Sequence, residues 1–218
     1  MKNLTELVFI LDRSGSMAGL ETDTIGGFNG LLTAQKQLEG RALVTTVLFD
    51  DQYELLHDRI DLQGVNLLTA KDYYVRGCTA LLDAIGRTVA KIKTAQEHTK
   101  AEQRPDKTLF TIITDGYENA SSEYTFAKVK QVLVQQQECG WEFVFIGANI
   151  DAIATASRMG IRRDRAANYV ADKDGVECCY EAVKSMNMSF RSGEGILDDW
   201  DQPLQADVRK RGRRGHRA

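Results

Sequence analysis

The chain has 218 residues, of which 43% are hydrophobic, 27% charged and 8% aromatic, and its formal net charge is −3. This size suits one globular domain with an ample core, and the composition excludes a disordered chain, a collagen-like repeat and a disulfide scaffold. The charge is unevenly distributed: residues 209–218 hold six of the 28 Lys/Arg and none of the 31 Asp/Glu, so residues 1–208 carry −9, which argues against nonspecific nucleic-acid binding by the body of the protein.

Apolar residues alternate between strand-like and helix-like spacing along the chain. Residues 7–11 form a continuous β-rich run, as expected of a strand buried on both faces. Residues 23–38 have apolar side chains at helical spacing but also three glycines, which predicts close packing against this helix. The later elements are predicted, in chain order, as strands over 42–49 and 53–57 joined by a turn, a helix over 80–97, a strand over 108–113, a helix over 122–138 capped by Ser122, a strand over 141–146, a helix over 151–159, a strand over 168–170 and a helix over 175–190.

This order of elements predicts an α/β protein with three layers, α-β-α. Helices cover both faces of an open, mostly parallel six-stranded sheet that has one antiparallel edge strand. We expect this domain to span residues 1–192 and to be followed by an extension over residues 193–218 with a basic, flexible end. Ligands of such sheets bind beyond the carboxyl ends of the strands, where the strand order reverses, so polar residues in those loops are the first functional candidates.

Neither a membrane segment nor a zinc site is predicted. No apolar run approaches the roughly 18–20 residues that a membrane helix needs, and the run over 7–11 is closed by Asp12 and Arg13, which is not typical of a signal peptide. The four cysteines include no Cys-x-x-Cys pair, and the three histidines are far apart. We therefore expect reduced thiols and a cytoplasmic location.

Three predicted loops carry oxygen ligands at the carboxyl edge of the sheet. Asp12, Ser14 and Ser16 follow the first strand at alternate positions, Asp115 follows the strand over 108–113, and Thr79 precedes the long helix. Carboxylates and hydroxyls without thiolate or imidazole are the ligands that hard divalent cations prefer, and Mg²⁺ in particular takes about six oxygens. The sequence therefore predicts a divalent-metal site, with Mg²⁺ as the expected ion and Mn²⁺ or Ca²⁺ as alternatives.

These motifs resemble the von Willebrand factor type A domain. Asp12-x-Ser14-x-Ser16, the Thr79 within Gly-x-Thr-Ala-Leu-x-Asp-Ala, and Thr114-Asp115-Gly116 match the metal-ion-dependent adhesion site of that family, and the similarity extends over residues 5–190. The pattern is more similar to the standalone bacterial type than to the secreted animal modules. The resemblance implies the strand order 3-2-1-4-5-6, which places the strand that ends at Asp12 beside the strand that leads to Asp115.

The resemblance also implies a role for each site residue. Ser14, Ser16 and Thr79 bind the metal through their hydroxyls, and Asp12 and Asp115 bind it directly or through water. Because few of these ligands are anionic, the ion keeps positive charge and can accept an Asp or Glu carboxylate from a partner protein in its open position. The resemblance thus implies a metal-dependent protein–protein interaction module without catalytic residues, and family members of this type accompany ATPases or kinase and phosphatase systems.

Two alternative functions stay open at this point. A Mg²⁺-dependent phosphotransferase or phosphatase of the haloacid-dehalogenase kind also has Asp after its first strand, but it requires a second carboxylate where Ser14 stands, and no His or Lys in these loops can activate a serine. A nucleic-acid or anionic-surface binder would act through the cations from Arg209 to Arg217.

Residues beside the site are expected to have structural roles. Arg13 is a cation next to the site, and the sequence leaves open whether it points away or repels the metal. The other expected roles are turns or caps for Asp23, Asp50 and Asp51, orientation of a loop for Asp83, and a solvated loop for Glu118 and Asn119.

Overall fold

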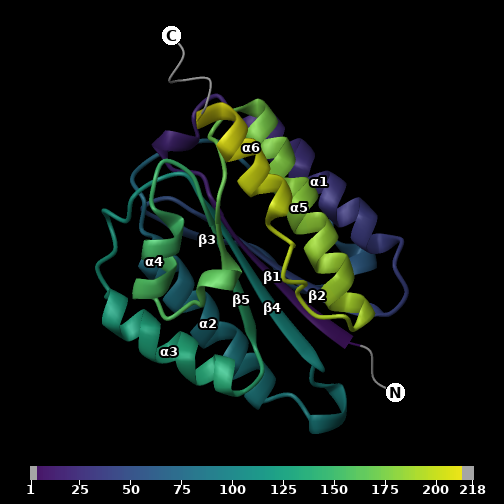
Figure 1. The fold of residues 1–218 in the computed structure, drawn as a ribbon. Coiled ribbons are helices and arrows are strands. Elements are labelled where there is room, and N and C mark those ends of the chain that lie inside the picture. The colour runs from purple at the N-terminus through teal and green to yellow at the C-terminus, as the bar shows by residue number, and fades with distance from the viewer. Residues whose placement is uncertain (1–3, 213–218) are drawn as a thin grey trace.

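A six-stranded sheet of order β3-β2-β1-β4-β5-β6 forms the centre of the molecule (Figure 1). The computed structural model describes residues 4–212. The β2–β3 pair is antiparallel, whereas the other neighbouring strands are parallel, so the predicted order and the single antiparallel edge strand are confirmed. The strands are β1 (Leu4–Asp12), β2 (Arg41–Phe49), β3 (Tyr53–Asp61), β4 (Lys107–Thr114), β5 (Glu142–Gly147) and β6 (Ala166–Asn168).

Helices cover both faces of this sheet and give the predicted three layers (Figure 1). On one face lie α1 (Glu21–Lys36), α5 (Lys173–Ser192) and α6 (Gln202–Gly212), and on the other lie α2 (Leu81–Glu97), α3 (Phe126–Glu138) and α4 (Ala152–Arg158). Short 3-10 turns complete the chain: η1 (Gly15–Met17), η2 (Leu62–Gly64), η3 (Ala101–Gln103) and η4 (Arg163–Arg165).

The apolar run of β1 divides its side chains between two cores. Leu7, Phe9 and Leu11 belong to the cluster beneath α1 and α5, whereas Val8 and Ile10 belong to the cluster beneath α2 and α3. Because successive side chains of a strand point to opposite faces, a central strand covered on both faces favours apolar residues at successive positions. This preference explains why residues 7–11 of β1 show no alternation of polar and apolar residues.

One of the three glycines of α1, Gly27, permits the close helix packing that the sequence predicts, whereas a Cβ atom at Gly26 or Gly30 would have no neighbour within 4 Å. A Cβ atom at Gly27 would lie 2.4 Å from the ring of Tyr180 on α5, which is closer than real Cβ contacts allow. The two helices can therefore approach each other only because position 27 has no side chain.

Several predicted element boundaries differ from the structure. The strand predicted over residues 53–57 continues to Asp61. The third long helix begins at Phe126 and not near Ser122, and its N-cap is Thr125, whose hydroxyl accepts a hydrogen bond from the Lys128 amide. Residues 122–124 instead donate three backbone hydrogen bonds to Asp83, which holds them outside the helix. The last strand occupies residues 166–168 and not 168–170, since it pairs with β5 from Phe145 to Gly147.

The chain after Ser192 is part of the folded structure as far as residue 212. Ile196, Trp200 and Leu204 are buried in the core beneath α5, and the Trp200 indole donates a hydrogen bond to the Asp164 carbonyl at 2.9 Å. Order is therefore not lost at residue 193, and the last basic residues, 213–218, lie outside the described part of the chain. Between residues 4 and 212, no helix combines the length and apolarity needed to cross a bilayer.

Candidate metal site

The five predicted site residues converge at the carboxyl edge of the sheet. β1 and β4 are neighbours in parallel register, with Leu11 opposite Ile113, so the residues that follow these strands come together. The segment before α2 joins them because the Gly15 amide donates a hydrogen bond to the Gly77 carbonyl at 3.1 Å. The strand order thus brings together three loops that are far apart in sequence.

The three hydroxyls and one carboxylate form a continuous hydrogen-bonded chain. Thr79 Oγ1 donates to Ser14 Oγ at 3.0 Å, Ser14 Oγ and Ser16 Oγ are 3.1 Å apart, and Ser16 Oγ donates to Asp115 Oδ1 at 2.5 Å. Ser14, Thr79 and Asp115 are buried, whereas Ser16 is exposed. The cluster is therefore covered by protein below and open to solvent on the side of Ser16.

Asp12 anchors the base of this cluster. One of its carboxylate oxygens accepts a hydrogen bond from the Ser14 amide at 2.7 Å, and the other accepts one from Thr114 Oγ1 at 2.5 Å. Burial raises the pKa of the Asp12 carboxyl, although these hydrogen bonds from Ser14 and Thr114 oppose the rise. The Tyr73 hydroxyl also donates to the Asp12 carbonyl at 2.5 Å. Sequence analysis did not identify Thr114 and Tyr73 as supports of Asp12, and no local pattern marks Tyr73.

Asp115 has an oxygen without a partner. Its side chain is 1% exposed, and Oδ2 accepts no hydrogen bond from any residue of the described chain. Burial raises the pKa of this carboxyl to about 6, and the charge of Asp12 adds to the rise, while the hydrogen bond from Ser16 opposes it. A buried carboxylate oxygen without a donor is costly, and a cation is one group that satisfies it.

Gly116 leaves the space above the hydroxyls free. A Cβ atom at this position would lie 2.9 Å from Ser16 Oγ and 3.1 Å from Thr79 Oγ1. Between residues 4 and 212, no group of three or more His, Cys, Asp or Glu side chains is arranged to hold a metal. A metal at this edge of the sheet would therefore depend on the hydroxyls, which fits a hard ion that prefers oxygen ligands.

Glu118 and Asn119 connect the Asp115 loop to the start of α2. Asn119 Oδ1 accepts a hydrogen bond from the Thr79 amide at 2.8 Å, and the Asn119 amide donates to the Thr79 carbonyl at 3.0 Å. Glu118 accepts hydrogen bonds from the amides of Leu82, Ala120 and Ser121. Both residues lie in a loop, as expected, and Asn119 is exposed, but their side chains also have a structural role because they fix the position of Thr79 relative to Asp115.

Asp83 has the expected structural role. Its carboxylate accepts hydrogen bonds from the amides of Ser122, Glu123 and Tyr124 at 2.9, 3.0 and 2.8 Å. These contacts orient the loop that precedes α3, and they leave Asp83 outside the hydroxyl cluster.

Arg13 points away from the cluster. Its side chain is fully buried, with Nε 2.9 Å from Asp50 Oδ2 and Nη1 2.7 Å from Glu54 Oε2. Asp50 also forms an ion pair with Arg76 at 2.6 Å. Burial of Asp50 favours a higher pKa of its carboxyl, but the hydrogen bonds from Arg76 and Gln52 and the charge of Arg13 outweigh burial and hold the pKa below its usual value. The positive charge of Arg13 is neutralised there, so it does not oppose a cation at the site.

Comparison of the sequence with models of known protein families gives no match, and comparison with curated proteins gives none either. Solved structures do match. Proximal thread matrix protein 1 from the mussel byssus is 13% identical, with a TM-score of 0.55 over 85% of this chain and 46% of that chain. A von Willebrand factor type A protein from Catenulispora acidiphila is 15% identical, with a TM-score of 0.55 over 86% of this chain and 43% of that chain.

A third structure, the manganese-loaded TRAP protein of Plasmodium vivax, is 16% identical, with a TM-score of 0.52 over 81% of this chain and 72% of that chain. Another structure of the mussel protein has zinc in its metal-ion-dependent adhesion site. The chain spans less than half the length of the mussel and Catenulispora proteins. These similarities show that the chain has the fold of a von Willebrand factor A domain.

Proposed function

We propose that this chain is a metal-dependent protein-interaction domain, which holds Mg²⁺ at the hydroxyl cluster and binds a carboxylate of a partner protein. Ser14, Ser16 and Thr79 supply neutral oxygens, and Asp12 and Asp115 supply the negative charge. Mn²⁺ is the alternative ion, because it accepts the same oxygen ligands; Ca²⁺ prefers more ligands at longer distances.

One observation carries this proposal: the carboxylate of buried Asp115 is joined through Oδ1 to a cluster of three hydroxyls, while its Oδ2 has no hydrogen-bond partner in the described chain. Hydroxyls of a purely structural turn would bond backbone groups, whereas these bond one another across two loops and reach the Asp115 carboxylate in a third. Two solved structures of the same fold, one loaded with manganese and one with zinc in its metal-ion-dependent adhesion site, support a divalent ion as the ligand.

The open side of the cluster gives the proposed partner its access. Only Ser16 of the five residues is exposed, so a partner group must approach past it. A divalent cation with two carboxylate ligands of its own still attracts a third, and a partner Asp or Glu supplies it. We therefore propose an acidic segment of another protein as the physiological ligand, in the setting of an ATPase or of a kinase or phosphatase system.

We also propose a cytoplasmic location, with which the four unpaired cysteines of the described chain are consistent.

The test is a metal titration followed by a carboxylate titration. With Mn²⁺ as the probe, the relaxation of water protons reports the waters bound to the ion, and added acetate should lower this relaxation by displacing one of them. Asp12→Ala combined with Ser14→Ala should abolish Mn²⁺ binding while the far-ultraviolet circular dichroism is retained. Binding of Mn²⁺ by the double variant with unchanged affinity would place the ion elsewhere.

An enzymatic function is the second candidate, favoured only by the contact between Ser16 Oγ and Asp115 Oδ1. We propose binding without turnover, because the hydroxyls also bond one another and are already placed as ligands. Phosphatase activity that survives repurification and is abolished by Asp12→Ala would refute this choice.

A further inference from the structure

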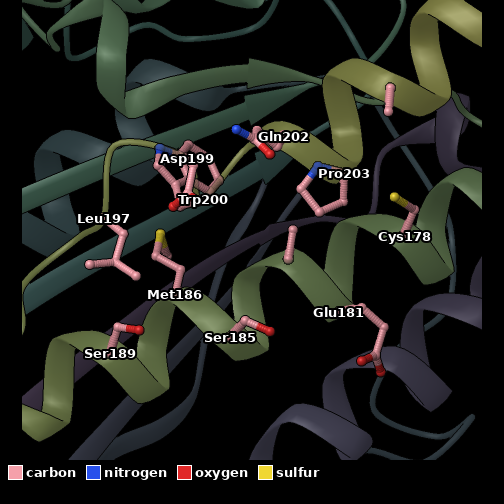
Figure 2. A pocket seen from close by; sticks show the side chains of 12 residues that line it. Cys178, Glu181, Ser185, Met186, Ser189, Leu197, Asp199, Trp200, Gln202 and Pro203 are labelled. Atoms are coloured by element: carbon pink, nitrogen blue, oxygen red, sulfur yellow. The ribbon is translucent and has the colours of Figure 1, made fainter.

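A groove separates α5 from the C-terminal segment that packs on it (Figure 2). We call it the C-terminal groove: it has a volume of about 560 Å³ and lies between one face of α5 and residues 197–206. None of its lining residues belongs to the loops of the metal site. Any ligand of this groove is therefore bound independently of the metal.

The floor of the groove is apolar. Ala182 and Met186 of α5 and Trp200 of the C-terminal segment form it, and all three are buried. Trp200 is held in place by its hydrogen bond to the Asp164 carbonyl, while Met186 is a flexible side chain that adapts to different ligand shapes. Leu197 stands at the edge with 44% of its surface exposed, and Figure 2 shows it on the opposite side of the groove from Ser185.

The length of the groove indicates the size of its ligand. The lining residues of α5 run from Cys178 to Ser189 at helical spacing, which at 1.5 Å per residue corresponds to about 17 Å. Small side chains, Ala182, Ser185 and Ser189, form half of this face and allow a backbone to come close. This space suits about three turns of a helix, which is longer than most small molecules.

One edge of the groove has a carboxylate without an ion-pair partner in the described chain. Residues 193–208 contain five Asp/Glu and no Lys/Arg. Of these acids, Asp199 lines the groove and makes no ion pair with any residue of the described chain. On the opposite edge, Glu181 is exposed and pairs with Lys184. An apolar floor beside the unpaired carboxylate of Asp199 is complementary to a segment with apolar residues on one face and a cation beside them.

We propose that the C-terminal groove binds a basic amphipathic helix of a partner protein. Apolar side chains of that helix, three and four residues apart, pack on Leu197 and over the floor formed by Met186 and Trp200, and a Lys or Arg side chain lies beside Asp199. The domain then has two separate interaction sites of opposite preference: the metal site for a carboxylate and the C-terminal groove for cations.

The test uses a fluorescent peptide of about 18 residues, composed of Leu and Lys in amphipathic helical order, and its Leu/Glu counterpart. Fluorescence anisotropy with the full chain should show binding of the Leu/Lys peptide alone, equally in EDTA and in Mg²⁺. Leu197→Ala should weaken this binding about fivefold, and Asp199→Lys about tenfold at low salt.

Matched controls separate the groove from general attraction to an acidic protein. Met188→Ala changes another exposed apolar residue of α5 that does not line the groove, and Glu102→Lys reverses a charge in η3; each should change the affinity by less than twofold. Equal losses in all four variants, or equal binding of the Leu/Glu peptide, would overturn the proposal. Self-association of the chain that Leu197→Ala removes would also overturn it, because a second copy would then occupy the groove.

Discussion

Replacing Asp115 by Asn should affect the stability of the metal-free protein and of the metal-bound protein in opposite directions. The amide has the shape of the carboxylate and its oxygen can still accept the hydrogen bond from Ser16. It removes the buried negative charge that lies beside Asp12 and that has one unpartnered oxygen. It also removes the charge that the proposed metal requires.

The size of the effect follows from the pKa of Asp115, which burial raises from 3.8 to about 6. Near neutral pH this shift of about two units corresponds to at most about 3 kcal/mol of destabilisation by the charged form, at about 1.4 kcal/mol per unit. Since the cluster is open to solvent beside Ser16, we reduce this value to about 1–2 kcal/mol. Without metal, Asp115→Asn should therefore raise the Tm by about 3–6 °C for a domain of this size.

With metal the order should reverse. A ligand that binds only the folded state at one hundred times its Kd stabilises that state by about 2.7 kcal/mol. The native chain should gain this stability when Mg²⁺ or Mn²⁺ replaces EDTA, and Asp115→Asn should gain little or none. The assay is thermal unfolding of both proteins in EDTA and over a series of metal concentrations.

Asp106→Asn is the matched control, because Asp106 lies at the other end of β4 and accepts a hydrogen bond from the Leu4 amide. This variant should respond to metal as the native chain does. An equal metal response of Asp115→Asn would refute the role of Asp115 as a ligand. A lower Tm of Asp115→Asn in EDTA would refute the argument from buried charge.

Three further changes test the supports of the site and the fold. Asn119→Ala should cost about 1 kcal/mol of stability and weaken metal binding, because it releases the Thr79 amide; unchanged metal affinity would show that this contact does not position Thr79. Gly116→Ala should reduce metal affinity about tenfold or more without changing the fold, because the added Cβ would lie 2.9 Å from Ser16 Oγ. Calorimetric titration measures the metal affinity, and a native affinity would contradict the assigned position of the ion. Burial holds the pKa of His57 below its usual 6.5, so the unfolded chain takes up a proton first as the pH falls, and folding stability should decrease below about pH 6.5. His57→Gln should lessen this decrease, which urea unfolding from about pH 7.5 to 5.5 measures. Identical pH slopes of the variant and the native chain would refute the role of His57.

The sequence by itself determined the elements and the chemistry of the candidate site. The uninterrupted apolar run of β1 predicted a strand covered on both faces, and the glycines of α1 predicted the close approach of another helix, because burial and helix packing limit the residue type at each position separately. The spacing of Asp12, Ser14 and Ser16 also predicted their convergence, since all three lie in one short loop.

Only the tertiary structure decided which groups pair across the molecule. Arg13 could have faced the site, but it is neutralised by Asp50, 37 residues away. Thr125 caps α3 because Asp83, on another helix, holds the residues before it. The segment after Ser192 is ordered because Trp200 finds a buried place and the Asp164 carbonyl. Periodicity in a sequence shows which face of an element is buried. A hydrogen-bond donor such as Arg13, however, could pair with many acceptors in the sequence, and only the packing of distant segments determines which one it binds.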